Sequence, residues 1–214
     1  MRIFISLIVF LCIVNVSKAQ VYLQNIQGTL IKGKSFTDVI GSPFLNDEFV
    51  NGNVALTNGD EFDGVPLKYS SYDDELFFKN PKDGSLLGFV VPVKSFELLG
   101  QNYIRGLPAV DNFTENSYYV LIADSKVKLL FKNYKTIIEN KLYGSANTEK
   151  KFEDNKVYYV FKEGKMLRFK PSKKGLLEIF SDKTTEIDSY LKKEKVDFKS
   201  NDELAKVFKY FSSL

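Results

Sequence analysis

The chain has 214 residues, of which 44% are hydrophobic and 27% are charged, and its formal net charge is +3. It contains no histidine and a single cysteine. These counts exclude Ser-His-Asp and Cys-His catalysis and His-ligated zinc, so any catalysis would depend on carboxylates, lysine, tyrosine or serine. Because basic and acidic residues nearly balance, the chain also lacks the clear excess of positive charge that is typical of nucleic-acid-binding proteins. We therefore expect no nucleic-acid partner.

Residues 1–19 have the pattern of a secretory signal peptide. Arg2 supplies the positive start, residues 3–14 form a short apolar segment, and Ser17-Lys18-Ala19 is a small-x-small cleavage site. We expect the mature protein to begin at Gln20 and to have no transmembrane segment after cleavage, because no second apolar run approaches membrane-spanning length. The pattern predicts export to the periplasm or the extracellular space, in soluble form.

Cleavage would also remove the single cysteine, Cys12, which lies inside the apolar segment. The residues before it, Phe10 and Leu11, are too large for the lipid-attachment motif of a lipoprotein. The remaining 195 residues carry 28 basic and 27 acidic side chains, and their number suits one domain with a full core. We expect no disulfide, no cysteine metal ligand and no bound cofactor.

Residues 20–170 are predicted to form an antiparallel β domain. From residue 44 onwards, apolar and polar side chains alternate with the period of two that is typical of half-buried strands. Three dipeptides indicate hairpin turns: Asn58-Gly59, Asp83-Gly84 and Glu163-Gly164. Two polar stretches, residues 100–116 and 140–155, are expected to be loops.

Residues 171–214 change to a helical period and are predicted to pack on the β domain. Ser172, Asp182 and Ser200 can each cap a short helix, the last of them in a capping box with Glu203. The apolar residues of the third helix recur with helical spacing: Leu204, Val207, Phe208 and Phe211. We therefore expect a mainly β (α+β) fold. Its antiparallel meander of about nine or ten strands would form an open barrel or sandwich, covered by three short C-terminal helices.

Two sequence patterns that point to catalysis have simpler explanations. Residues 28–35 match the phosphate-loop pattern G-x-x-x-x-G-K-[ST], but Gly41-Ser42-Pro43 follows too soon for the helix that such a loop requires. Acidic runs such as Asp73-Asp74-Glu75 lie beside predicted turns, and neighbouring strand residues point to opposite faces. Glycosidases need two carboxyl groups that face each other. We predict no catalytic residue and no metal site.

The candidate binding residues are lysines and tyrosines of the predicted strands. Lys126, Lys128 and Lys132 would lie on one strand face that Tyr134 continues, which suits anionic glycans or lipid headgroups. The other interpretation is a solvated face that protects the sheet from edge pairing. Tyrosines elsewhere could build a ligand cleft or simply pack in the core. The candidates among these are Tyr69 and Tyr72.

Two segments of the chain carry a resemblance. They are PFLNDEFVNGNVALTNGDEFDGVPLKYSSYDDELFF and the ending SNDELAKVFKYFSSL, of which VPLKYSSYDDELFF is the most distinctive part. With these segments the chain resembles a group of uncharacterised exported bacterial proteins that have a strand-rich body and a short helical C-terminal tail. The resemblance implies bacterial export and a shared fold, and it implies no activity, cofactor or catalytic residue.

Together these features favour a non-enzymatic binding module that is secreted or held in the bacterial envelope. Its ligand would be a protein partner, a glycan or a lipid-like molecule. The alternative is a carboxylate-dependent hydrolase that acts on envelope or extracellular glycans. Two convergent carboxyl groups in a polar cleft would favour the hydrolase, and an open apolar interior would favour a carrier of lipid-like ligands.

Overall fold

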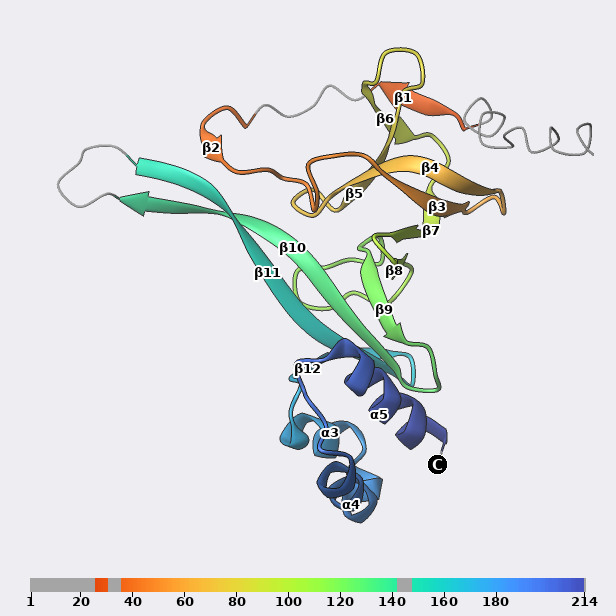
Figure 1. The fold of residues 1–214 in the computed structure, drawn as a ribbon, viewed down its shortest axis with the longest axis vertical. Helices are drawn as coiled ribbons and strands as arrows, with labels where there is room; N and C mark the ends of the chain where they lie inside the picture. The colour runs from red at the N-terminus through yellow and green to blue at the C-terminus, as the bar shows by residue number, and fades with distance from the viewer. Residues whose placement is uncertain (1–25, 31–35, 142–147, 214) are drawn as a thin grey trace, which may run out of the picture.

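The computed structural model describes residues 26–30, 36–141 and 148–213. The predicted signal peptide, residues 1–19, and the predicted first mature residue, Gln20, lie outside the described residues. The described chain is rich in strands and has three α-helices near its C-terminus, so the expected fold class is confirmed. The strands form one open sheet, and Figure 1 shows the helices gathered at one end of it.

Twelve strands are present among the described residues. Their order in the sheet is β1-β6-β5-β4-β3-β7-β8-β9-β10-β11-β12, with antiparallel pairs, and β2 alone runs parallel, beside β11. Their bounds are β1 (Gly28–Leu30), β2 (Val39–Ile40), β3 (Val50–Leu56), β4 (Glu61–Ser70), β5 (Glu75–Lys79), β6 (Leu86–Phe89), β7 (Val93–Leu98), β8 (Gln101–Ile104), β9 (Tyr119–Ala123), β10 (Lys128–Lys141), β11 (Thr148–Lys162) and β12 (Lys165–Phe169).

The predicted turn dipeptides connect neighbouring strands. Asn58-Gly59 joins β3 to β4, and Gly59 has a φ of 94°. Glu163-Gly164 joins β11 to β12 with φ values of 51° and 75°. Two successive positive φ values give a turn whose twist matches that of the flanking strands. The predictions for these two hairpins are confirmed.

Of the two predicted loops, the first is largely confirmed and the second is largely wrong. The stretch 100–116 begins with β8, which pairs with β7 and β9, and residues 105–116 belong to the β8–β9 connection. The stretch 140–155 belongs mostly to β11, and residues 142–147 lie outside the described residues. In the distal half of the β10–β11 hairpin most side chains are half-buried or exposed. Because neither face of this half of the hairpin lies against a core, its sequence does not alternate between apolar and polar residues, and the strands could not be predicted from such a pattern.

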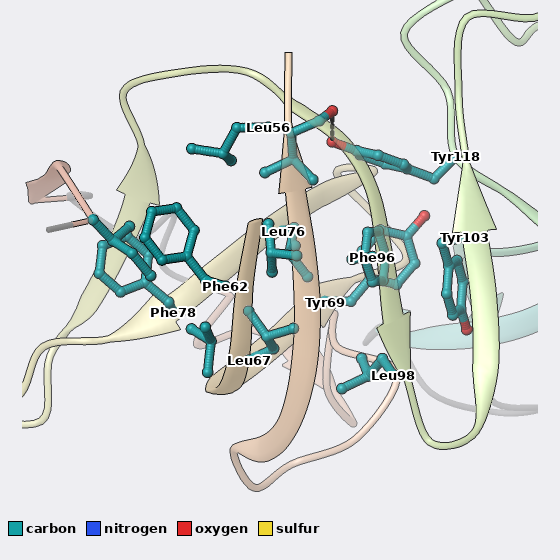
Figure 2. Packing of buried hydrophobic residues seen from close by; sticks show 14 of the residues in the cluster. Leu56, Phe62, Leu67, Tyr69, Leu76, Phe78, Phe96, Leu98, Tyr103 and Tyr118 are labelled. Carbon is teal, nitrogen blue, oxygen red and sulfur yellow. Dashed lines mark hydrogen bonds between the residues drawn. The ribbon is translucent and has the colours of Figure 1, made fainter. Parts of the chain in front are cut away.

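The first hydrophobic core lies under strands β3 to β8 (Figure 2). Its fully buried members include Leu67, Tyr69 and Leu98. Phe96 and Tyr103, on neighbouring strands, stack with their ring centroids 4.4 Å apart. Tyr69 lies 5.5 Å from the Phe96 ring and 5.4 Å from the Tyr103 ring. This candidate binding residue is therefore part of the core.

The helices α3 (Lys173–Ile179), α4 (Thr184–Glu194) and α5 (Asn201–Ser213) cover the other end of the sheet. The four apolar residues predicted for the third helix are buried in one cluster with sheet residues such as Leu129 and Val160. Ser172 caps α3 by accepting the Gly175 N–H at 3.1 Å. None of the helices among the described residues is long and apolar enough to cross a membrane.

The capping prediction for the second helix is wrong. Asp182 lies within a 3₁₀ turn (Ser181–Lys183), and α4 begins after Lys183 without a side-chain cap. For the third helix, the Glu203 N–H donates to Ser200 Oγ at 3.3 Å, which is the Ser200 half of the predicted capping box.

Candidate functional site

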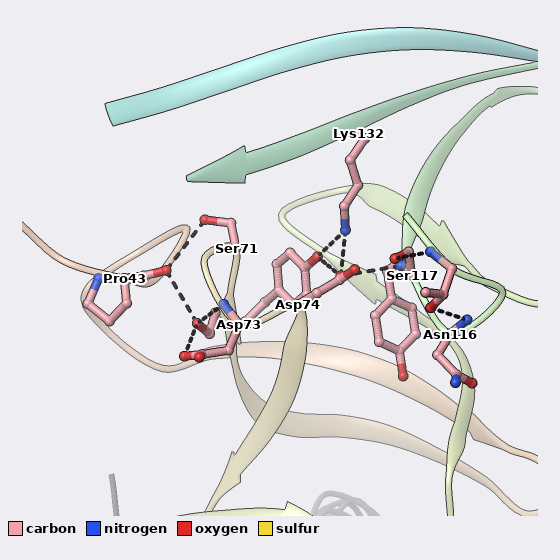
Figure 3. Close-up of polar contacts among 11 residues, drawn as sticks. Pro43, Ser71, Asp73, Asp74, Asn116, Ser117 and Lys132 are labelled. Atoms are coloured by element: carbon pink, nitrogen blue, oxygen red, sulfur yellow. Dashed lines mark hydrogen bonds and ion pairs between the residues drawn. The ribbon is translucent and has the colours of Figure 1, made fainter. Parts of the chain in front are cut away.

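A lysine and an aspartate from distant parts of the chain form a buried ion pair. Lys132 lies on β10 with its side chain only 1% exposed, and Asp74 lies in the turn between β4 and β5. Lys132 Nζ is 2.5 Å from Asp74 Oδ1 and also donates a hydrogen bond of 3.1 Å to the Tyr69 hydroxyl. The same carboxylate oxygen accepts the Tyr69 O–H at 2.5 Å and the Tyr118 N–H at 3.3 Å. Figure 3 shows Lys132 pointing toward Asp74.

The β4–β5 turn holds Asp74 in place. Asp74 has a left-handed backbone, with a φ of 60°, which aspartate adopts more readily than most residues. Earlier in the turn, the Asp73 N–H donates to Ser70 Oγ at 3.0 Å, and Ser70 pairs with Glu75 across the hairpin. The Lys135 N–H donates to the Ser71 carbonyl at 3.0 Å, which attaches the turn to β10. The turn is therefore held both within the hairpin and against β10, independently of the ion pair between Asp74 and Lys132.

Burial has opposite consequences for the charged and neutral members of this cluster. Desolvation lowers the pKa of Lys132, and the Asp74 carboxylate acts against that shift. Desolvation raises the pKa of Tyr69 well above its ordinary value, and Asp74 adds to that increase. The lysine ammonium also lies 5.5 Å from the centroid of the Phe113 ring and 5.9 Å from that of Tyr119. Aromatic faces and one carboxylate thus replace the water that a surface lysine would have.

The predicted lysine strip is divided among three environments. Lys126 is exposed in the turn before β10, and Lys128 is partly exposed and pairs with Asp124. Lys132 is buried, so the three ammonium groups do not form one exposed cationic surface. Two candidates that the sequence analysis kept apart, Lys132 and Tyr69, are in direct contact.

Tyr72 has a different neighbourhood. It packs with Phe36 and Phe152 in a triangle of rings whose centroids are 5.2 to 5.4 Å apart. The three residues come from the segment before β2, from the β4–β5 turn and from β11. They connect the segment before β2 to the β4–β5 turn and to the distal half of the β10–β11 hairpin.

Tyr134 lines a cleft of about 560 Å³ between the β8–β9 connection and strands β10 to β12. We call it the tyrosine cleft. Its walls combine three aromatic rings with hydrogen-bonding side chains: Asp111, Asn112, Phe113, Tyr134, Thr136, Val157, Tyr159 and Arg168. The Phe113 and Tyr134 rings meet edge to face with their centroids 5.3 Å apart. Phe113 also covers the Lys132 ammonium, so this ring separates the cleft from the buried ion pair.

The polar wall of the tyrosine cleft is organised around Asp111. This residue has a φ of 50° in a tight turn that the Val110 and Phe113 backbones close by mutual hydrogen bonds of 3.1 and 2.9 Å. Its Oδ2 accepts the Tyr159 O–H at 2.7 Å and lies 3.9 Å from Arg168 Nη1. Burial and this hydrogen bond raise the pKa of Tyr159. The Arg168 side chain is 71% exposed, which leaves its guanidinium donors accessible to a ligand.

A second cleft, of about 250 Å³, opens beside Asp74. We call it the Asp74 cleft. It is lined by two carboxylates, one guanidinium and mainly apolar side chains: Asp74, Glu75, Leu76, Phe77, Gly88, Phe89, Pro92, Val93, Arg105 and Tyr118. The Asp74 side chain remains 22% exposed there, although its Oδ1 is bound by Lys132. The ion pair therefore lies between two clefts of different composition.

Three residues that line the clefts were not predicted from the sequence: Asp111, Arg105 and Arg168. One signal was available, because Arg105 and Arg168 are the only arginines after the predicted cleavage site. Their placement was not predictable, since it depends on strand register. Arg168 stands opposite Tyr159, which stands opposite Leu130, and this register follows from a hairpin partly predicted as a loop.

Comparisons with known proteins found no matching family model, no similar curated protein and no similar solved structure. Among the described residues, no group of three or more acidic side chains is arranged to hold a metal ion. Within the phosphate-loop match, Gly28 begins β1 and pairs with Phe89, and residues 31–35 lie outside the described residues. The two clefts are therefore the features of this chain that bear on its function.

Proposed function

We propose that this protein is a non-enzymatic binding module of the bacterial envelope or extracellular space, and that it binds a glycan in the tyrosine cleft. The observation that carries the proposal is the pairing of three aromatic rings with Asp111, Asn112 and Arg168 in one accessible cleft. Apolar walls with a few convergent polar groups are typical of small-ligand sites.

The chemistry of a sugar ring matches these walls. A pyranose presents C–H groups on its faces and hydroxyl groups around its rim. Tyr134 and Phe113 supply apolar ring surface for the faces. Asp111 can accept hydrogen bonds from the sugar hydroxyl groups, and Arg168 can donate hydrogen bonds to them. Charge-assisted hydrogen bonds of this kind are stronger than neutral ones. Because Tyr159 already orients the Asp111 carboxylate, little ordering remains to be done on binding.

The hydrolase alternative has less support. A glycosidase of the usual kind needs two carboxyl groups on opposite sides of the scissile bond, about 5 to 9 Å apart. Among the described residues that line the tyrosine cleft, Asp111 is the only carboxylate. A third cleft, of about 330 Å³, is lined by Glu61, Asp63 and Glu97, but all three side chains are exposed to solvent. The general acid of a glycosidase instead lies in an apolar environment.

The proposed location depends on residues 1–19. Their positive start, short apolar segment and small-x-small motif support export, and the resemblance described above supports a bacterial envelope. Glycans are abundant in that environment, both as cell-wall polymers and as surface polysaccharides.

The proposal can be tested with the chain that begins at Gln20, using an array of bacterial and plant oligosaccharides followed by calorimetry on any that bind. We expect Tyr134→Ala and Arg168→Met each to weaken binding roughly tenfold or more, as loss of a stacking ring or a charged donor does. Tyr210→Ala and Arg105→Met are the matched controls, since Tyr210 is an exposed ring on α5 and Arg105 lines the other cleft. Absence of binding across the array, or equal affinities for all four variants, would refute the proposal.

A further inference from the structure

We propose that the Asp74 cleft is a separate binding site for a small zwitterion, namely a free α-amino acid with an apolar side chain. The inference is independent of the glycan proposal, because the two clefts share no lining residue. It depends on three features of the cleft: a fixed carboxylate, an arginine with accessible donors, and apolar walls of limited volume.

The carboxylate of Asp74 is held by the interior of the protein. Its Oδ1 receives Lys132 Nζ, the Tyr69 hydroxyl and the Tyr118 N–H. Lys132 is itself buried, so Asp74 is held from the interior of the protein by a group that is fixed away from solvent. The second carboxylate oxygen lies outside this network and belongs to a side chain that lines the cleft. A carboxylate fixed in this way can accept hydrogen bonds from a ligand ammonium without first being ordered.

Glu75 adds a second acceptor. It is exposed, follows Asp74 in the chain and begins β5. Two carboxylates and one cation at the rim give the cleft an excess of negative charge. Lys132, behind Asp74, offsets part of that excess, since it pairs with Asp74 directly. The acidic side of the cleft is therefore suited to one ammonium group rather than to a divalent cation, for which more oxygen ligands are needed.

Arg105 supplies the complementary group. Its guanidinium lies 5.4 Å from the centroid of the Tyr118 ring, and its half-buried side chain lines the cleft. A guanidinium fork matches the geometry of a carboxylate, which it can bind through two parallel hydrogen bonds. Because Arg105 and Asp74 line the same cleft, one ligand that carries both an ammonium and a carboxylate would satisfy both.

The remaining walls limit the size and polarity of the ligand. Phe77 and Val93 are buried, and Phe89 and Pro92 complete the apolar surface. Gly88 stands opposite Phe77 in the β5–β6 pair and adds no side chain to this wall. The volume of about 250 Å³ is below the usual range for drug-sized ligands, roughly 300 to 1,000 Å³. The side chain and backbone groups of a single amino acid fit this volume.

The experiment is calorimetric titration of the chain from Gln20 with L-leucine, L-valine and L-phenylalanine. Two fragments of leucine separate the contributions of the ligand ammonium and the ligand carboxylate to binding. Isopentylamine has no carboxylate, and 4-methylpentanoate has no ammonium. We expect an intact amino acid to bind and each fragment to bind at least roughly tenfold more weakly, because each loses one charge-assisted contact. Binding of the amine as tight as that of the amino acid would overturn the zwitterion assignment, as would no binding of any of the amino acids.

Substitutions then locate the site. Arg105→Met and Glu75→Gln should each weaken amino-acid binding, Arg105→Met the more strongly, while Arg168→Met and Glu115→Gln should leave it unchanged. Arg168 belongs to the tyrosine cleft, and Glu115 is an exposed acid outside both clefts. Thermal unfolding of each variant checks that the fold is intact. Loss of amino-acid binding in Arg168→Met but not in Arg105→Met would place the ligand in the tyrosine cleft and refute the proposal. Glycan binding provides a separate readout, so either proposal can fail while the other stands.

Discussion

At the scale of single residues, the most consequential feature is the burial of Lys132. A charge in the protein interior is tolerated only when a partner of opposite sign and hydrogen bonds replace its water. Asp74 and Tyr69 provide these, and Phe113 and Tyr119 cover what remains. The lysine therefore connects β10 to the β4–β5 turn. It can influence the Asp74 cleft through Asp74 and the tyrosine cleft through Phe113.

Removing one partner of this pair should cost far more than removing both. Asp74→Asn leaves the Lys132 ammonium buried and unpaired, and we expect the free energy of unfolding to fall by about 3 to 5 kcal/mol. The double variant Asp74→Asn with Lys132→Met should recover a large part of that loss, since an apolar side chain then occupies the apolar surroundings. Urea denaturation of the three proteins measures the difference. Lys128→Met is the control, because its ion pair is partly exposed and worth less than about 1 kcal/mol. Equal losses for Asp74→Asn and the double variant would contradict this account.

Buried tyrosines predict the response to alkaline pH. Desolvation raises the pKa of Tyr118 and of Tyr119 to about 12, and also raises those of Tyr69, Tyr103 and Tyr159. A tyrosine in the unfolded chain ionises near pH 10, at about its ordinary pKa. Above that pH the folded state binds more protons than the unfolded state, so stability is fully present below about pH 10 and falls as the pH rises toward 12.

Lys132 acts in the opposite direction. Its lowered folded pKa means that the unfolded state binds more protons between that value and the ordinary lysine pKa of about 10.4, so its contribution to stability rises with pH in that interval. One lysine opposes five tyrosines, and we expect a net decline above pH 10. Urea midpoints measured at intervals across this range, with tyrosinate absorbance followed in parallel, test the expectation. A midpoint that stays constant up to about pH 12 would contradict it.

At the scale of elements, α5 is part of the second core. Phe208 and Phe211 are buried, together with Leu204 and Val207, in the cluster that contains Leu129 of β10. A helix of this length is only marginally stable alone in water, so its stability depends on this packing. Phe208 also meets the Phe169 ring edge to face, with the centroids 5.3 Å apart.

We therefore expect Phe208→Ala or Phe211→Ala to lower the free energy of unfolding by about 3 to 5 kcal/mol, which is the usual cost of truncating a buried phenylalanine. Lys206→Ala on the same helix is the control, because its side chain is exposed and forms a surface ion pair with Glu203. Denaturant midpoints compare the three variants. Similar midpoints for all of them would mean that the helix does not contribute to the core.

The elements that the sequence predicts correctly are those with local signals. Gly59 turns the β3–β4 hairpin with a φ of 94°, which few residues other than glycine adopt, and Ser172 caps a helix that begins with the next residue. The distal half of β10 and β11 has no such signal, since it is defined by pairing across the hairpin and not by an apolar face. The candidate site divides in the same way. Lys132 and Tyr134 stand out in the sequence. Asp74, which pairs with Lys132, and Asp111, which lines the same cleft as Tyr134, gain significance only from contacts between distant segments.

At the scale of the whole molecule, the sheet places the two clefts on either side of one ion pair. The first core lies under β3 to β8, and the second lies between the helices and strands β10 to β12. Asp74 and Lys132 join these two parts across 58 residues of sequence. The ring triangle of Phe36, Tyr72 and Phe152 joins them a second time. Asp74 lines one cleft, and Phe113, which covers the Lys132 ammonium, lines the other, so we expect the two proposed sites to unfold together.

The parallel pairing of β2 with β11 has a consequence for the order of folding. It consists of two residue pairs, Lys150 with Val39 and Lys151 with Ile40, and the Lys150–Asp38 contact beside it spans 112 residues. Closing so long a loop for so small a contact is entropically unfavourable until the rest of the sheet has formed. A chain made from its N-terminus releases β2 early, yet the strand that receives it is completed more than one hundred residues later. We therefore expect β2, one of the early strands to be synthesised, to be among the last to reach its native position.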